Sequence, residues 1–157
     1  MIPEKVKKVL DEHGLQAVEF EEGSTPTSVL AARKLGVEVG QIAKSLLFMG
    51  KNQRFHLVVC QGDRKVSPSK LKAVTGTKTR LANGEETLSA TGFELGGVCP
   101  FGIEGIAVLI DEHLKAYTVI YPAAGTNASG VPMTFEQLVS ITGGRVYDLT
   151  VPMGQES

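Results

Sequence analysis

The sequence predicts a single α+β domain, 1–157, built around a mixed or largely antiparallel sheet. Segments typical of helices and of strands are dispersed along the chain, without the strict alternation of a parallel βαβ fold. The two most apolar strand-like segments, 42–49 and 54–60, are separated by only four residues, and such short connections join antiparallel strands. A chain of 157 residues supports one core, and no linker or repeat divides it.

In the N-terminal part, apolar residues at helical spacing predict a helix over 3–13, and the following apolar stretch predicts a short strand over 15–20. Thr25 as the capping residue and Pro26 as the first helical residue predict a second helix that ends before Gly36. The two strands of the hairpin each contain a continuous apolar run, so both are expected to lie deep in the sheet.

In the C-terminal part, capping residues mark where three helices begin, because their side-chain oxygens accept from the first free main-chain N–H groups. These helices start at Ser67 (running to Val74), at Asn83 with Glu86, and at Thr134 with Gln137 (running to Thr142). Apolar runs predict further strands over 106–110, 117–121 and 145–149. The glycine-containing segments 96–102 and 123–127 are expected to form loops.

Composition excludes several classes of protein. No apolar run approaches the roughly 20 residues that span a bilayer, and no export signal is visible, so a cytoplasmic protein with no membrane partner is expected. Cys60 and Cys99 lack metal-type spacing and the three histidines are scattered, so we expect free thiols, no metal and no cofactor. A net charge of −1 excludes a global basic field for nucleic acid.

One local bias in charge stands out. Six basic residues and no acidic residue occur between Arg64 and Arg80. Two interpretations stay open for this stretch. It forms either a solvated helix face followed by a basic strand, or a surface that binds phosphates in a salt-sensitive way. On the second interpretation, the residues that contact nucleic acid are Arg64, Lys65, Lys70 and Lys72.

Lys44 is the most unusual candidate for chemistry, because it opens the apolar strand 42–49. A charge beside a buried strand is costly unless it is paired or meets a ligand, although an edge lysine can also reach solvent. Other catalytic signatures are missing: no nucleophile elbow, Walker or dinucleotide motif occurs in its required context. Asp111 and Glu112 are adjacent, so they would point to opposite faces of a strand.

Several short motifs occur in an order and at spacings that resemble one known family. They are 31–36 (AARKLG), 41–48 (QIAKSLLF), 62–63 (GD), 70–71 (KL), 91–92 (TG), 96–102 (GGVCPFG), 110–111 (ID) and 124–126 (AGT). Together they resemble the YbaK/prolyl-tRNA-synthetase editing-domain family, also called aminoacyl-tRNA deacylase-like. The resemblance covers nearly the whole chain.

This resemblance implies a strongly curved, barrel-like sheet surrounded by helices, and hydrolysis of amino acids wrongly attached to tRNA, chiefly tRNA for proline. Lys44 matches the lysine that the family requires. Gly96 and Pro100 match the G-x-x-x-P loop that lines the substrate pocket, and Gly125 and Thr126 match a small-residue loop on the opposite wall. The implied partners are a mischarged aminoacyl-tRNA and prolyl-tRNA synthetase.

The chain departs from the pattern of members that clear cysteine. Those members carry Tyr, Ser and Asp near the positions where this chain has Phe20, Ala123 and Gly130. The departures remove polar groups from the expected pocket. The resemblance therefore implies alanine or another small amino acid as readily as cysteine.

These observations predict a free-standing trans-editing deacylase in which Lys44 is the catalytic residue. An aminoacyl ester is already activated, so its hydrolysis needs positioning and a place for developing negative charge. Lys44 would hold the terminal phosphate or the carbonyl group, while main-chain N–H groups at glycines would approach closely because glycine lacks Cβ. The expected substrate-binding residues are Phe20, Gly96, Gly97, Pro100, Ala124, Gly125 and Thr126.

Two other functions stay open. The chain could be a non-catalytic module that holds tRNA or a synthetase, or it could act on a small aminoacyl compound without tRNA. Cys99 as a nucleophile is disfavoured, because nothing near it in the sequence lowers its pKa.

Overall fold

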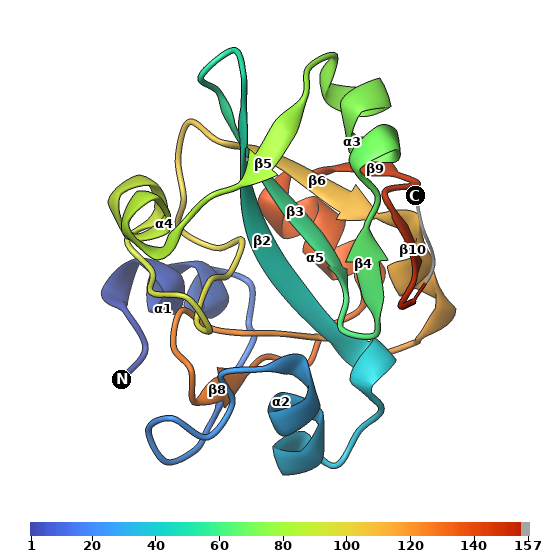
Figure 1. The fold of residues 1–157 in the computed structure, drawn as a ribbon. Coiled ribbons are helices and arrows are strands. Elements are labelled where there is room, and N and C mark those ends of the chain that lie inside the picture. Colours follow the sequence, from blue (N-terminus) through green and yellow to red (C-terminus); the bar gives the residue numbers. More distant parts are fainter. Residues whose placement is uncertain (155–157) are drawn as a thin grey trace.

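A mixed six-stranded sheet forms the centre of the molecule (Figure 1), in a computed structural model that describes residues 1–154. Its strands run in the order β5-β2-β3-β6-β9, with β7 beside β2. The bounds are β2 (Ile42–Gly50), β3 (Phe55–Gln61), β5 (Thr79–Leu81), β6 (Ala107–Asp111), β7 (Tyr121–Pro122) and β9 (Arg145–Tyr147). Pairing of β2 with β3 and β5 is antiparallel, and pairing of β2–β7, β3–β6 and β6–β9 is parallel. The mixed sheet is as predicted, but it stays open over residues 1–154, so barrel-like closure is not confirmed.

Helices and two small ribbons surround this sheet (Figure 1). The helices are α1 (Glu4–Glu12), α2 (Ser28–Leu35), α3 (Pro68–Thr75), α4 (Gly84–Thr91) and α5 (Phe135–Thr142), with 3-10 turns η1 (Val39–Gln41) and η2 (Glu112–Ala116). One antiparallel ribbon pairs β1 (Val18–Glu19) with β8 (Ser129–Gly130). The other pairs β4 (Arg64–Val66) with β10 (Thr150–Pro152). None of the helices in the described part of the chain is long and apolar enough to cross a membrane.

Local sequence explains where most of these elements begin. Ser67, Asn83 and Thr134 cap α3, α4 and α5 as predicted, each accepting a hydrogen bond from a main-chain N–H three residues later. The hairpin between β2 and β3 also forms as predicted, and the Gly50 N–H donates to the Arg54 carbonyl across it at 2.9 Å.

Three expected segments differ from the structure. Helix α2 begins two residues later than expected, because Thr27 caps it, while the Thr25 hydroxyl is buried and accepts from Ser129 N at 3.1 Å. Segment 117–121 mostly follows η2 and is held by single contacts, such as the bridge of Ile120 with Met133, so only its last residue lies in a strand. The expected strand 15–20 is reduced to β1. The expected strand 145–149 is reduced to β9, and the next strand, β10, begins only at Thr150.

The central strands separate two apolar clusters. In β3, Leu57 and Val59 belong to the larger cluster, and Val58 and Cys60 belong to the smaller one on the other face. Alternate side chains of a strand point to opposite faces, so a strand covered on both sides needs an unbroken apolar run. This explains why the sequence of β3 shows no polar alternation.

One edge of β2 is only partly paired. Strand β7 pairs with Ile42 and Ala43, and β5 pairs from Phe48 onward, so no strand within residues 1–154 covers the stretch 44–46, which we call the edge gap. The carbonyl of Ile42 accepts from Gly62 on the β3 side. Main-chain groups alternate between the two edges in an antiparallel pair, so the N–H and C=O of Ser45 face the edge gap. The Leu47 carbonyl, two residues on, follows the same phase and accepts from Ala82 N at 2.8 Å.

Candidate active site

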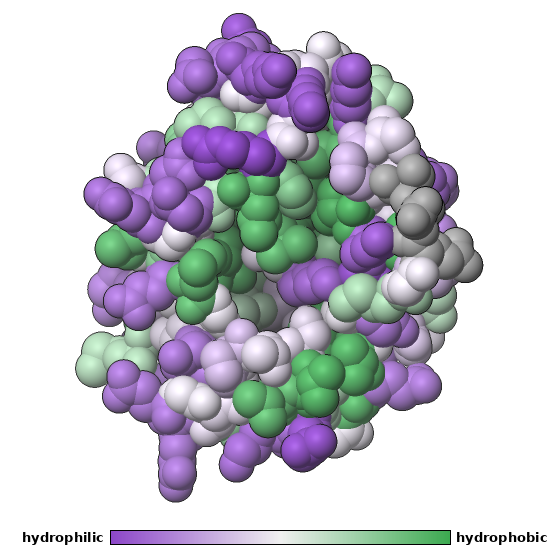
Figure 2. Space-filling view, viewed as in Figure 1, coloured by the Kyte–Doolittle hydropathy of each residue, from purple (hydrophilic) through white to green (hydrophobic). Residues whose placement is uncertain are grey.

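A cavity of about 260 Å³ opens beside the edge gap of β2. The face shown in Figure 2 is hollowed near its middle, and apolar side chains gather on both sides of the hollow. The walls of this first cavity come from β2, α2 with the residues before it, and the two predicted loops. The lining residues are Thr25, Pro26, Thr27, Ser28, Ala31, Leu35, Ile42, Ala43, Lys44, Ser45, Leu46, Gly96, Val98, Tyr121, Ala123 and Ser129.

Lys44 contributes a half-buried ammonium group to this cavity. Its Nζ donates a hydrogen bond to the main-chain oxygen of Arg64 at 2.7 Å. An ammonium group has three N–H donors, and the remaining two have no acceptor within the described part of the chain. A partly desolvated cation with unused donors favours a ligand that carries negative charge or a polarised carbonyl.

The start of α2 lies in the same cavity. Thr27 caps this helix by accepting from Leu30 N at 3.2 Å. The N–H groups of Ser28 and Val29 have no partner inside the helix, as at every helix N-terminus. The partial positive charge there adds to that of Lys44, so two features on the cavity wall favour an anion.

The remaining walls are small and mostly apolar. The lining residues Ala31, Ala43, Ala123 and Val98 have small apolar side chains. Ser45 is 8% exposed, and its Oγ has no hydrogen-bond partner among the described residues. Buried hydroxyls are normally satisfied, so this position retains unused hydrogen-bonding capacity at the cavity wall. Ser45 was not singled out from the sequence, where no signal distinguishes it from an ordinary strand residue.

A second cavity of about 320 Å³ holds four of the predicted substrate-binding residues: Phe20, Gly97, Gly125 and Thr126. The two predicted loops touch between the cavities. A Cβ atom on Gly97 would lie 2.8 Å from the main-chain carbon of Thr126, so only glycine permits this approach. Gly96 lines the first cavity and Gly97 the second. The loop contact therefore lies between them.

Of the predicted substrate-binding residues, only Gly96 shares the first cavity with Lys44. Pro100 and Ala124 are buried and line neither cavity. The Thr126 hydroxyl is engaged within its loop, where it donates to Ser129 Oγ at 2.9 Å and accepts from Ala128 N at 3.2 Å. Substrate contacts by these residues stay predictions.

The four predicted nucleic-acid contacts lie on β4 and α3 and do not line the first cavity, although the Arg64 carbonyl contacts Lys44. Two of them are engaged inside the protein. The Arg64 guanidinium donates to Thr150, and Lys70 Nζ lies 2.9 Å from both Asp148 Oδ1 and the Thr150 carbonyl. Lys65 is half-buried and Lys72 is exposed. A role in binding nucleic acid stays a prediction for all four.

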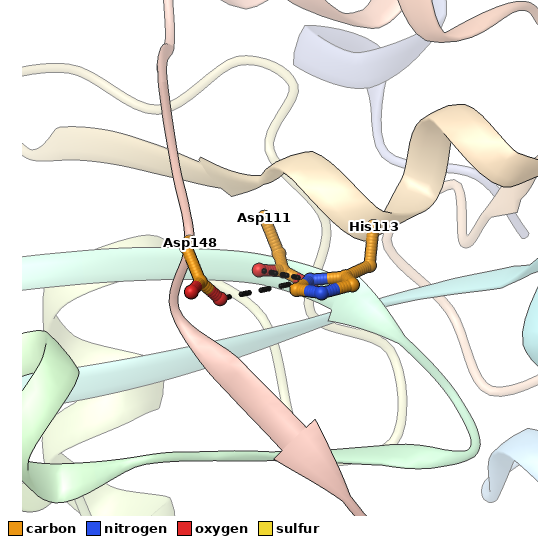
Figure 3. A group of neighbouring side chains, drawn as sticks. All are labelled: Asp111, His113 and Asp148. Atoms are coloured by element: carbon orange, nitrogen blue, oxygen red, sulfur yellow. Dashed lines mark hydrogen bonds and ion pairs between the residues drawn. The ribbon is translucent and has the colours of Figure 1, made fainter.

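A cluster of Asp111, His113 and Asp148 was not expected from the sequence (Figure 3). Asp111 is fully buried, and its carboxylate accepts from Leu149 N at 2.9 Å and from the Thr150 hydroxyl at 2.7 Å. His113 Nδ1 lies 3.0 Å from Asp111 and 3.8 Å from Asp148. These are metal-ligating residue types, yet their polar atoms already serve one another and Lys70. The cluster is a hydrogen-bonded network that joins buried Asp111 to the partly exposed side chains of His113 and Asp148.

Both cysteines are buried and line neither cavity. Burial raises the pKa of the Cys60 thiol to about 12, although the charge of Lys44, opposite it across the β2–β3 pair, acts in the other direction. Burial likewise raises the pKa of Cys99 to about 12. A thiol that stays protonated is a poor nucleophile, which agrees with the expectation that Cys99 is not catalytic.

Comparisons with known proteins show what the chain as a whole is similar to. The family model described as "Aminoacyl-tRNA editing domain" matches residues 22–141. The protein YwhH of Bacillus subtilis is 37% identical over 127 residues, which cover 80% of this chain and 81% of YwhH. An Enterococcus faecalis protein named "Putative Cys-tRNA(Pro)/Cys-tRNA(Cys) deacylase EbsC" is 24% identical over 148 residues, covering 91% and 90%. A crystal structure of "a putative trans-editing enzyme for prolyl tRNA synthetase" superposes with a TM-score of 0.86 at 32% identity, over 96% of this chain and 99% of that one.

Proposed function

This chain belongs to the aminoacyl-tRNA editing domain family, and on that premise we propose that it is a deacylase that hydrolyses the ester bond of mischarged tRNA. The observation that carries the proposal is the placement of Lys44. Its half-buried ammonium group lines a small cavity beside unpaired main-chain groups of β2. We propose Lys44 as the catalytic residue.

The chemistry needs no covalent intermediate. Water, activated by a ribose hydroxyl or by another bound water, attacks the ester carbonyl, and the ribose oxygen leaves with a proton. Negative charge develops on the carbonyl oxygen, where preorganised donors lower the barrier most. Lys44 and the N–H of Ser45 are the donors that we assign to this oxygen. The start of α2 is suited to the terminal phosphate.

We propose tRNA for proline, carrying alanine or cysteine, as the substrate. The alanine and valine side chains of the cavity wall leave space for a small amino acid. The names of the EbsC relative and of the trans-editing structure point to tRNA(Pro) and to prolyl-tRNA synthetase as the synthetase whose errors are corrected. An apolar pocket separates side chains that differ by one methylene by only about 1–3 kcal/mol, so more than one small amino acid should be accepted.

We further propose that the tRNA body contacts the basic surface of β4 and α3, with Lys65 and Lys72 as the more available contacts and Arg64 and Lys70 as inner ones. Beyond the contact between the two loops, the walls of the site would then be formed by the remaining predicted substrate-binding residues. These are Phe20, Gly97, Pro100, Ala124, Gly125 and Thr126. Charged tRNA is used in the cytoplasm, and we propose that the protein acts there without a cofactor.

The test is single-turnover deacylation of tRNA(Pro) charged with alanine, cysteine, serine or proline. Because the loss of one preorganised donor costs about 10²–10³ in rate, Lys44→Ala should lower deacylation at least that far while its circular dichroism stays native. Lys34→Ala is the matched control, since this lysine is exposed on α2 and does not line the cavity. A folded Lys44→Ala protein with full activity contradicts the proposal. A wild-type protein that binds charged tRNA without hydrolysing it is instead the binding module.

A further inference from the structure

We propose that Asp111, at the end of β6, is a positioning residue that holds Lys44 in place through Thr150 and Arg64. The kinetic consequence rests on the proposed function, whereas the geometric claim does not. No part of this path lies next to Lys44 in the sequence. It is a chain of four hydrogen-bonded residues that begins at a buried carboxylate and ends at the cavity.

The path ends on a main-chain atom. Lys44 Nζ donates to the Arg64 carbonyl at 2.7 Å, and the structure shows no carboxylate partner for this ammonium group in the described chain. A lysine side chain is long and flexible, so one hydrogen bond decides much of where its ammonium group lies. The position of the Lys44 ammonium therefore depends on the position of the β4 main chain.

Strand β4 has little support of its own. It spans three residues and, among the residues that the structure describes, pairs only with β10, and a two-stranded ribbon of this kind is marginally stable in isolation. The side chain of Arg64 strengthens it by reaching across to β10. Its Nε donates to Thr150 Oγ1 at 2.7 Å, and its Nη2 donates to the Thr150 carbonyl at 3.2 Å. The hydrogen bonds from the Arg64 side chain to Thr150 thus fix the position of the Arg64 carbonyl group.

Thr150 connects the β4–β10 ribbon to the central sheet. It is fully buried, and its hydroxyl accepts from Arg64 while donating to Asp111 Oδ2 at 2.7 Å. Asp111 closes β6, one strand away from β3 and two from β2. Its carboxylate also accepts from Leu149 N, and His113 faces it from η2 (Figure 3). These partners offset the cost of burying the carboxylate, which then holds the β4–β10 ribbon against the sheet.

If Asp111 only stabilised the β4–β10 ribbon, its effect would end at β10 and would not reach Lys44. The variants are therefore chosen to distinguish this structural role from the positioning of Lys44. Thr150→Val has nearly the same shape but lacks the hydroxyl, so it removes the contacts with Arg64 Nε and with Asp111 and leaves only the Arg64 Nη2 contact with the main-chain carbonyl. Thr150→Ser retains the hydroxyl and should restore them. Asp111→Asn keeps the shape of the carboxylate, but Leu149 N and Thr150 donate to different oxygens, and one of these becomes an NH2 group that cannot accept. Ile110→Val is the control, because it weakens the core beside Asp111 without touching the path.

The first measurement does not depend on activity. Lysines of the folded protein are acetylated under limiting reagent, and mass spectrometry gives the labelling rate of Lys44 relative to exposed Lys72 of the same molecule. Loss of one hydrogen bond corresponds to about a 3- to 10-fold change in an equilibrium, so Thr150→Val and Asp111→Asn should raise relative Lys44 labelling by about that factor. Thr150→Ser and Ile110→Val should stay at the wild-type ratio. Unchanged labelling in Thr150→Val, or an equal rise in Ile110→Val, overturns the proposal.

The second measurement is a double-mutant cycle in single-turnover deacylation. Thr150→Val should lower the maximal rate about tenfold with little change in the substrate concentration for half-maximal rate, and it should have no further effect when Lys44 is already alanine. Multiplicative effects would show that Thr150 acts independently of Lys44 and would overturn the proposal. If the wild-type protein hydrolyses no charged tRNA, the proposed function fails, and the labelling measurement still decides the positioning claim.

Discussion

At the scale of single residues, two consecutive residues of β2 contribute different groups to the candidate site. Lys44 supplies a charge through its side chain, and Ser45 supplies a donor and an acceptor through its main chain. Side chains of neighbouring strand residues point to opposite faces of a sheet. Lys44 and Ser45 nevertheless both line the cavity, because it lies beside the uncovered edge of β2. Two adjacent residues therefore offer a ligand two different kinds of contact.

The cysteines give a residue-scale prediction. Burial raises the pKa of Cys60 and Cys99 to about 12, so native protein at pH 8 should show no reaction of either thiol with Ellman's reagent, and both should react in guanidinium chloride. Because the folded pKa lies above the ordinary value of 9.0, the thiols favour the folded state below pH 9. This contribution is lost as the pH rises towards 12. Rapid consumption of one reagent equivalent by native protein would contradict the prediction.

Residues of the site were predictable where a local pattern singles them out. Lys44 interrupts an apolar strand and Gly96 belongs to a motif, so the sequence singled out both residues, and both line the first cavity. Asp111 and Thr150 were missed because their contact joins strand ends that are distant in the chain, and no local pattern encodes such a pairing. Thr25 was mistaken for a cap because two threonines flank Pro26, and only the fold shows that Thr27 caps the helix while Thr25 accepts from Ser129.

At the scale of elements, the start of α4 illustrates how a side chain can join a helix to a strand. Glu86 completes the capping box by accepting from Asn83 N at 3.0 Å. It also accepts from Arg80 of β5 at 2.8 and 2.7 Å. The two contacts tie the edge strand that follows the edge gap to the next helix.

This arrangement predicts a pH dependence. The Arg80 hydrogen bonds, with the Asn83 N–H, lower the pKa of Glu86 to about 2. Since the folded pKa lies below the ordinary value of 4.5, the stabilisation is fully present above pH 4.5 and is lost as the pH falls towards 2. Glu86→Gln keeps an acceptor for the cap but not the ion pair. Its urea midpoint should therefore fall less steeply than that of wild type between pH 4.5 and 2, by a small amount because the pair is exposed.

The control for this comparison is Glu85→Gln, on the same helix turn but outside the pair. Parallel decline of wild type and Glu86→Gln over that pH range would show that the ion pair does not contribute.

Whole elements were predicted well where apolar periodicity and caps agree, as in β2, β3, α3 and α5. The failures share one physical cause. Segments 15–20 and 117–121 have strand-like composition, but the pairing partners available to them are one or two residues long, so little regular strand forms. Composition reports what a segment favours, whereas strand length also depends on its neighbours. The short strand β4 was not expected as a separate element, whereas β5 is the basic strand that one interpretation of the stretch 64–80 placed after a helix.

At the scale of the whole molecule, the central sheet makes the two apolar clusters depend on each other. Strand β3 sends alternate side chains into both of them, and β2 and β6 also contribute to both. Loss of packing in either cluster would therefore also disrupt the packing of the sheet.

We therefore expect the chain to unfold as one domain. Far-ultraviolet circular dichroism, which reports on helices and strands, and tyrosine fluorescence, which reports on the three tyrosines in a chain without tryptophan, should give the same urea midpoint. Two separated transitions would show that part of the chain forms an independent unit and would contradict the expectation of a single domain.

The edge gap has a consequence for how this protein tolerates sequence change. Every residue except proline presents the same amide at position 45, so a ligand that pairs with the strand there binds atoms that substitution does not remove. Alanine scanning will under-report such a site, and only a backbone replacement, such as an ester in place of the amide, will reveal it. If the proposed deacylase anchors its substrate at this amide, side chains around the cavity are free to diverge and alter which acyl group is accepted, while the anchoring persists.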